Sequence, residues 1–146
     1  MSVIFRRYIM LHKRIVVVIA SVLMTLGIVA TAAPVFAGNT GNTYWRNVYR
    51  VGSPYDHTPA RKKENRSVYY NKTNNVHIKG GYIVIWAALY DGRDVSGGHS
   101  YKSYQGMVTH LWNEAVEHYG KGVSVRINSK KAANGWADGV WSPDSK

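Results

Sequence analysis

The strongest strand signal in this 146-residue chain is YIVIWAALY, residues 82–90. Successive side chains of a strand point to opposite faces of its sheet. One face then carries Tyr82, Val84, Trp86, Ala88 and Tyr90, and the other carries Ile83, Ile85, Ala87 and Leu89. Because both faces are apolar, we expect a central strand that is covered on both sides.

Weaker strand signals lie on either side of this segment. Apolar and aromatic side chains predict short strands over residues 44–51, 67–71, 76–78, 123–127 and 136–141. Clusters of Gly, Pro, Asn and Asp predict loops or turns over residues 52–59, 72–75, 80–81 and 91–100. Short strands with frequent turns are typical of a mainly β domain, so we expect a small antiparallel β-sandwich.

One segment departs from this pattern and predicts a helix. Apolar side chains recur there at helical spacing, at Met107, Val108, Leu111, Trp112, Ala115, Val116 and Tyr119. Gly120 follows, and glycine commonly ends a helix because it adopts a left-handed conformation without strain. We therefore expect one short amphipathic helix over Met107–Tyr119.

The N-terminal segment has the three parts of a secretory signal. Its positive charges come from Arg6, Arg7, Lys13 and Arg14. Residues 15–33 are apolar, and Val35 and Ala37 are the small side chains that signal peptidase requires before its cut. We expect residues 1–37 to be a cleaved signal peptide and residues 38–146 to be a single secreted domain.

Two alternatives remain for this leader. Its apolar run approaches the length of about 20 residues that crosses a bilayer, so an uncleaved membrane anchor is the competing interpretation. Translation has two candidate start sites, Met1 and Met10, and the second gives a leader of more usual length.

The expected secreted domain is basic and lacks cysteine. Four of the 19 Lys and Arg residues lie in the leader, so residues 38–146 carry 15 basic and eight acidic side chains, a net charge of +7. Such a surface favours anionic partners. After export these are lipid headgroups or phosphate-rich wall polymers rather than nucleic acid. The absence of cysteine excludes a thiol nucleophile and a cysteine-ligated zinc.

No catalytic or metal-binding constellation stands out. His57, His77 and His99 have no Ser or Asp partner at a motif spacing, so we expect a protein that is not an enzyme. On the predicted helix His110, Glu114 and His118 share one face. A row of this length spans about 12 Å, too far for all three to ligate one ion. Two of the three still suit a shared ion, but we expect no metal and no cofactor.

The best candidate for binding is a charge run followed by aromatic residues. It comprises Arg61, Lys62, Lys63, Arg66, Tyr69 and Tyr70, and we add Trp141 near the C-terminus. Arg and Lys supply charge for phosphate groups, and tyrosine suits stacking or anchoring at an interface.

Two stretches resemble a loose group of small exported proteins from Gram-positive bacteria, most of which have no established function. These stretches are RKKENRSVYY, residues 61–70, and GVWSPDS, residues 139–145. The group is similar in size, leader and β character to lactococcin 972-type bacteriocins, which are β-sandwich proteins that act at the cell-wall precursor lipid II. The resemblance covers both ends of the expected domain, and it assigns no functional residue.

Taken together, these features predict a secreted, basic, non-enzymatic protein that binds an anionic component of the bacterial envelope. A lipid II-like molecule or an anionic lipid would be its partner, and its action would be bacteriocin-like. One alternative is an exported accessory protein that acts on a neighbouring envelope protein. A cell-wall hydrolase that uses Glu114 with Asp91 is less favoured.

Overall fold

The structure, a computed structural model, describes residues 38–145. These residues belong to one compact unit. The predicted signal peptide, residues 1–37, lies outside the described residues. In the part of the chain that is described, no helix is both long and apolar enough to cross a membrane.

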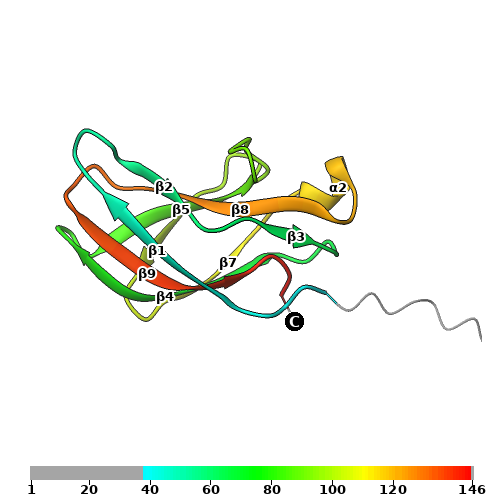
Figure 1. The fold of residues 1–146 in the computed structure, drawn as a ribbon, viewed down its shortest axis with the longest axis horizontal. Helices are drawn as coiled ribbons and strands as arrows, with labels where there is room; N and C mark the ends of the chain where they lie inside the picture. The colour runs from blue at the N-terminus through cyan, green and yellow to red at the C-terminus, as the bar shows by residue number, and fades with distance from the viewer. Residues whose placement is uncertain (1–37, 146) are drawn as a thin grey trace, which may run out of the picture. The chain divides into compact units, whose positions relative to one another are not determined.

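Nine strands and one short helix make up this unit (Figure 1). In chain order the first elements are β1 (Thr43–Tyr49), β2 (Tyr55–His57), β3 (Arg61–Lys63), β4 (Tyr69–Ile78) and β5 (Tyr82–Leu89). They are followed by β6 (Tyr101–Tyr104), β7 (Val108–Leu111), α2 (Ala115–Tyr119), β8 (Val123–Lys130) and β9 (Gly135–Ser142).

The strands form two antiparallel sheets. The first sheet has the order β1-β9-β4-β7, and the second has the order β2-β8-β5-β6, with β3 also paired to β8. Figure 1 shows β1, β9 and β4 on one side of the unit and β2, β8 and β5 on the other. The expected antiparallel β-sandwich is thereby confirmed.

The hydrophobic core lies between the two sheets. The first sheet contributes large aromatic side chains, Trp45, Tyr49, Tyr69 and Trp141, and the second contributes aliphatic ones, Ile83, Ile85, Leu89, Val125 and Ile127. Burying a large apolar side chain stabilises a fold by roughly 1.5–3 kcal/mol. Packing of this kind holds the unit together without a disulfide bond.

β5 is central, as its sequence predicts, because it lies between β8 and β6. Its odd-numbered side chains are fully buried in the core. The prediction that both faces of this strand are covered is wrong, because Tyr82, Val84 and Trp86 are only half-buried. Their face is the outer face of the second sheet. The phenol and indole groups tolerate this position because each carries a polar atom that can remain in water.

The helix predicted over Met107–Tyr119 is wrong in its first part. Residues 108–111 form β7, which pairs with β4, and only Ala115–Tyr119 are helical. Thr109 and Leu111 are buried while their neighbours are exposed, which is the alternation of a strand. Val108 and Thr109 are β-branched and favour strands, and pairing with β4 satisfies backbone groups that a helix would satisfy internally.

This change also separates the row of three predicted ligands. His110 lies on β7, whereas Glu114 and His118 remain neighbours at the helix, with Nδ1 and Oε2 3.9 Å apart. Across residues 38–145 no three His, Asp or Glu side chains gather closely enough to hold a metal ion.

Further segments also differ from the sequence-based prediction. The two short strands expected at residues 67–71 and 76–78 are one strand, β4, whose register shifts between Thr73 and Asn75. This bulge accommodates the extra residue within the ladder, so no turn is needed. The predicted loop at residues 52–59 contains β2, and the short strands β3 and β6 have no counterpart in the prediction.

Candidate functional site

The two stretches that carry the family resemblance meet in space. In β3 the Lys63 side chain points inward, and its Nζ lies 3.0 Å from Oδ1 of Asp144 near the C-terminus. The same ammonium donates to the carbonyl oxygens of Ser67 at 2.5 Å and Pro143 at 2.6 Å. Both charged side chains are 0% exposed. We refer to Lys63, Asp144 and the groups bonded to them as the Lys63–Asp144 junction.

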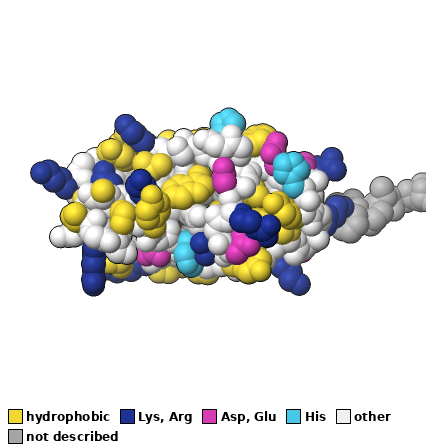
Figure 2. Space-filling model, turned by 90° about the horizontal axis from the view of Figure 1, so that it is seen from above, with side chains coloured by type: hydrophobic (Ala, Val, Ile, Leu, Met, Phe, Trp, Pro, Cys, Tyr) yellow, Lys and Arg dark blue, Asp and Glu magenta, His cyan; other side chains and the backbone are white. Residues whose placement is uncertain are grey.

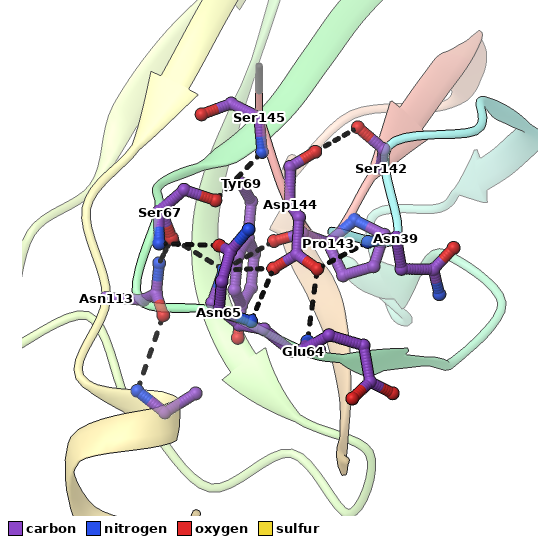
Figure 3. Close-up of polar contacts among 12 residues, drawn as sticks. Asn39, Glu64, Asn65, Ser67, Tyr69, Asn113, Ser142, Pro143, Asp144 and Ser145 are labelled. Carbon is purple, nitrogen blue, oxygen red and sulfur yellow. Dashed lines mark hydrogen bonds and ion pairs between the residues drawn. The ribbon is translucent and has the colours of Figure 1, made fainter. Parts of the chain in front are cut away.

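The Asp144 carboxylate also binds the main chain, as Figure 3 shows. Its Oδ2 accepts hydrogen bonds from the amides of Asn39 at 2.7 Å and Glu64 at 3.0 Å. Nearby, the Ser145 amide donates to Oγ of Ser67 at 2.9 Å. The junction thus joins the beginning of the described chain, the segment after β3 and the C-terminal residues.

Burial and hydrogen bonding act in opposite directions on this pair. Burial by itself raises the pKa of Asp144, but the Asn39 and Glu64 amides and the Lys63 ammonium outweigh it, so the pKa lies below its ordinary value. Burial is also the largest influence on Lys63, and it lowers the pKa of the ammonium despite the neighbouring carboxylate. The charges of the junction are satisfied within the protein, which gives it a structural role.

Three of the seven predicted binding residues are therefore not surface groups. Lys63, Tyr69 and Trp141 are each 0% exposed, and they belong to the junction or the core. The Lys63 ammonium lies 5.0 Å from the centre of the Tyr69 ring, which in turn packs against Trp141. The predicted surface is corrected at these positions, because alternate residues of a strand that borders the core point inward whether or not they are charged.

The other four predicted residues do not share one face. Arg61 is half-buried and its guanidinium donates to Gly41 O and Asn39 Oδ1. Lys62 and Arg66 are exposed, and Lys62 lies on β3 beside the second sheet. Tyr70 lies on β4 of the first sheet.

Tyr70 borders a surface hollow. Its ring lies 5.9 Å from that of His110, centre to centre. The hollow has a volume of about 310 Å³ and is lined by Thr40, Asn42, Tyr70, His110, Ser142, Asp144 and Ser145. Its side chains include no Lys or Arg, so it lacks the charge that the sequence-based hypothesis requires.

Cations and aromatic rings do come together on the outer face of the second sheet. We define the cation–aromatic face as Tyr55, Tyr82, Trp86, Lys102, Tyr104, Lys130 and Lys131. Figure 2 looks onto this side of the sandwich and shows hydrophobic side chains with Lys and Arg side chains among and around them. The face is built from β2, β8, β5 and β6, together with the residue that follows β8.

The register of the strands explains this arrangement. Tyr55 on β2 is opposite Lys130 on β8, Lys130 is opposite Val84 on β5, and Val84 is opposite Lys102 on β6. One cross-strand row therefore places one lysine on each side of an apolar residue. In the neighbouring row Tyr82 is opposite Tyr104, with ring centres 5.7 Å apart.

Each of the three lysines contacts a tyrosine ring. Lys131 Nζ lies 3.4 Å and Lys102 Nζ 5.0 Å from the centre of the Tyr82 ring, and Lys130 Nζ lies 5.0 Å from that of Tyr55. Contacts of this type hold a cation near the negative face of a ring, and they contribute about 0.5–1 kcal/mol at exposed sites.

These three lysines have no carboxylate partner. Within residues 38–145, the ion pairs join Lys63 to Asp144, Arg93 to Asp91 and His118 to Glu114. No carboxylate of residues 38–145 thus pairs with the lysines of the cation–aromatic face. A face of this kind can attract an anion and offer rings for its carbon skeleton to pack against.

Sequence reasoning did not find this face because its members are far apart in the chain. They come from four strands between residues 55 and 131. The available signal was the excess of tyrosine and tryptophan combined with lysines in otherwise apolar segments. The dense charge run at residues 61–66 directed the sequence-based prediction to a different group of cations.

Comparison with known proteins gives one family. Residues 33–145 match the family described as Protein of unknown function (DUF2712). No curated protein and no solved structure matches the chain significantly. The family agrees with the resemblance to a group without an established function, whereas the similarity to lactococcin 972-type bacteriocins stays a prediction.

Proposed function

We propose that this chain, which belongs to the DUF2712 family of proteins of unknown function, binds an anionic component of the bacterial envelope through the cation–aromatic face. One observation carries the proposal: Lys102, Lys130 and Lys131 surround two tyrosine rings and have no carboxylate partner among the described residues. The partner is a phosphate-rich polymer of the cell wall, and lipid II-like molecules and anionic lipids, which share its phosphate groups, are the other candidates.

The architecture supports binding to a polymer with repeated charges. Neighbouring strands lie about 4.7–4.9 Å apart, so the row through β8, β5 and β6 sets Lys130 and Lys102 about 10 Å apart at the backbone. Each exposed ion pair contributes little by itself. Several phosphates of one polymer that contact several lysines at once would bind far more tightly than one phosphate, because later contacts form within the same complex.

The proposed protein is non-enzymatic. The acids of the alternative hydrolase have other partners, since Asp91 pairs with Arg93 and Glu114 with His118. Clearing of a cell-wall suspension would contradict this part of the proposal.

Export is part of the same proposal. The leader at residues 1–37 would deliver the protein to the envelope, where the polymers of interest are located. Bacteriocin-like killing is a narrower form of the hypothesis. It predicts inhibition of Gram-positive strains by the purified protein, and binding without inhibition would restrict the function to envelope attachment.

Sedimentation with purified cell-wall sacculi tests the proposal. Sacculi that retain their phosphate-rich polymers should bind the protein, and sacculi stripped of these polymers with hydrofluoric acid should not. Binding should weaken steeply between about 0.05 and about 0.5 M salt, since screening shortens the range of exposed charges. Equal binding to both preparations would contradict the proposal, and clearing of the suspension would favour the hydrolase.

Matched triple variants locate the binding surface. The Lys102→Gln, Lys130→Gln and Lys131→Gln triple should weaken binding by about tenfold, or about 0.5 kcal/mol for each lysine. The control triple Lys62→Gln, Arg66→Gln and Lys72→Gln removes the same charge from exposed positions elsewhere. Equal loss in both triples would mean that only net charge matters. Loss in the control alone would favour the charge run that the sequence suggested.

Lack of binding to any envelope preparation would favour the alternative hypothesis, an exported accessory protein that acts on a protein partner. Anionic-lipid liposomes serve as the third preparation in this comparison. Binding to liposomes but not to intact sacculi would move the target from the wall to the membrane.

A further inference from the structure

The cation–aromatic face contains a hollow beside its lysines. It has a volume of about 250 Å³ and lies where β2, β8 and β5 adjoin. Its lining comprises Tyr55, Asp56, His57, Trp86, Arg126, Asn128 and Ser129. This volume suits one small polar molecule or a single unit of a polymer rather than a long segment.

Arg126 is the cation of this hollow. It is half-buried on β8, and its Nε donates to Oδ1 of Asn128 at 2.8 Å. Among the described residues its two terminal nitrogens have no hydrogen-bond acceptor and no ion-pair partner. Arginine stays charged at every physiological pH. A half-buried guanidinium therefore presents a free, two-pronged donor edge.

The nearby carboxylates are engaged with other groups. Asp91 pairs with Arg93 at 2.8 Å. Burial lowers the pKa of Arg126, and the Asp91 charge acts against that lowering without forming an ion pair. The two oxygens of Asp56 accept the amides of Val48 and His57, each at 2.8 Å. Neither acid forms an ion pair with Arg126.

The Asp91-Gly92 turn leaves room for the guanidinium. Gly92 has a φ of +94°, and a Cβ at this residue would lie 2.9 Å from Nη2 of Arg126, so a larger residue would crowd it. The carbonyl oxygen of Gly92 also accepts a hydrogen bond of 3.4 Å from Nδ2 of Asn128, the same side chain that accepts from Nε. Asn128 thus orients the Nε side of the guanidinium.

Aromatic side chains form another part of the lining. Trp86 is directly opposite Asn128 across the β5–β8 ladder, and the Tyr55 ring meets Trp86 edge-on with ring centres 6.5 Å apart. An indole beside a fixed guanidinium combines an apolar surface with a charged donor, which suits a ligand that has a carbon skeleton and a phosphate.

We infer that this hollow is a subsite for the phosphate ester of a small polyol or sugar. The phosphate accepts two hydrogen bonds from the terminal nitrogens of Arg126, and the carbon skeleton packs against Trp86. The inference rests on the proposed function, because it names the repeating unit that the cation–aromatic face takes from an anionic polymer. Lys130 and Lys102 then contact phosphates of neighbouring units.

Nuclear magnetic resonance of the full chain tests the subsite with soluble probes. Inorganic phosphate, glycerol 3-phosphate and glucose 1-phosphate should each shift the Nε–H signal of Arg126. The two esters should also shift the indole signal of Trp86. Glycerol and glucose, which lack phosphate, should leave the Arg126 signal in place. The relative affinities of the two esters identify the polyol or the sugar as the preferred unit.

Arg126→Lys is the decisive variant, because it keeps the charge and loses the two-pronged donor edge. Ester binding should weaken by about tenfold or more. The control is Arg66→Lys, which makes the same change at an exposed arginine outside the hollow, and it should bind as the unchanged protein does. Trp86→Ala should weaken binding of glucose 1-phosphate and leave inorganic phosphate unaffected. Thermal unfolding of each variant verifies that it is folded.

The outcomes separate this inference from the proposed function. Unshifted Arg126 signals, or an Arg126→Lys variant with unchanged affinity, would overturn the subsite even where sacculi still bind through the three lysines. Ester binding that depends on Arg126, in a protein that does not sediment with sacculi, would support the subsite and overturn the proposed polymer.

Discussion

Lys63 and Lys102 lie at the same distance, 5.0 Å, from the centre of a tyrosine ring, yet their surroundings differ in every other respect. Lys63 is fully buried and paired with Asp144, and its ammonium also donates hydrogen bonds to two carbonyl oxygens. Lys102 is exposed on the outer face of the second sheet and has no carboxylate partner among the described residues.

The comparison teaches that a lysine–tyrosine contact does not by itself indicate a binding site. The role of the lysine depends on whether its ammonium group has hydrogen-bond and ion-pair partners within the protein. A buried cation must be fully bonded within the protein or the fold is strongly destabilised. An exposed cation that is left unpaired costs little, because water solvates it, and it remains available to a ligand. The junction therefore supports stability, whereas we propose that the cation–aromatic face supports recognition.

The largest expected effect concerns stability. Lys63→Met should lower the free energy of unfolding by about 3–5 kcal/mol, because it keeps the apolar stem and leaves the Asp144 carboxylate buried without its counter-ion. Lys102→Met removes an exposed contact and should cost less than about 1 kcal/mol. Urea unfolding of both variants measures the difference. Similar losses would show that burial does not distinguish the two lysines.

A second prediction uses the pH dependence of stability. The pKa of Asp144 is lower in the folded than in the unfolded protein, so its ionised form stabilises the fold above the unfolded value of about 3.9. This stabilisation is lost as pH falls below that value and through the folded pKa. Asp144→Asn should be less stable at neutral pH and should lose less stability on acidification.

Asp91→Asn is the control for this experiment. The pKa of Asp91 is also lowered, chiefly by the backbone amide of Arg93, but the carboxylate is at the surface and water screens it. Unfolding curves between pH 2 and pH 7 should be nearly those of the unchanged protein. If the free energy of unfolding of Asp144→Asn still falls at low pH as much as that of the unchanged protein, other carboxylates control acid unfolding.

The smallest expected effect concerns the rings of the cation–aromatic face. Tyr82→Leu removes the ring that Lys102 and Lys131 contact, and it should weaken binding to sacculi by about two- to fivefold. Tyr82→Phe keeps the ring and should bind as the unchanged protein does. A loss in Tyr82→Phe equal to that in Tyr82→Leu would assign the contribution to the hydroxyl group instead.

The sequence predicted the sandwich better than it predicted the site, for identifiable reasons. A strand such as Tyr82–Leu89 is encoded by its own side chains, so local pattern was sufficient to identify it. Residues 108–111 fit both a helical stripe and a strand, and pairing with β4, which lies outside the local sequence, decided between them. The bulge in β4 likewise depends on its neighbours, and local pattern indicated a turn instead.

Charge density directed the sequence-based prediction to residues other than those of the face that we propose. Residues 61–66 hold the densest charge run, but the run contains an inward position, and nothing local to Lys63 reveals that Asp144, some 80 residues later in the chain, is its partner. The face that we propose draws one or two residues from each of β2, β5, β6 and β8, together with the residue after β8. Its composition becomes visible only when the register of these strands is known.

Lysine acetylation footprinting, with and without soluble wall polymer, tests the central claim most directly, because it reads every lysine in the unchanged protein. We predict that the polymer protects Lys102, Lys130 and Lys131, whereas Lys62, Lys72 and Lys79 react equally in both samples. Lys63 should be unreactive throughout, as its burial requires. Protection of Lys62 and Lys72 with continued reaction of the three face lysines would contradict the account.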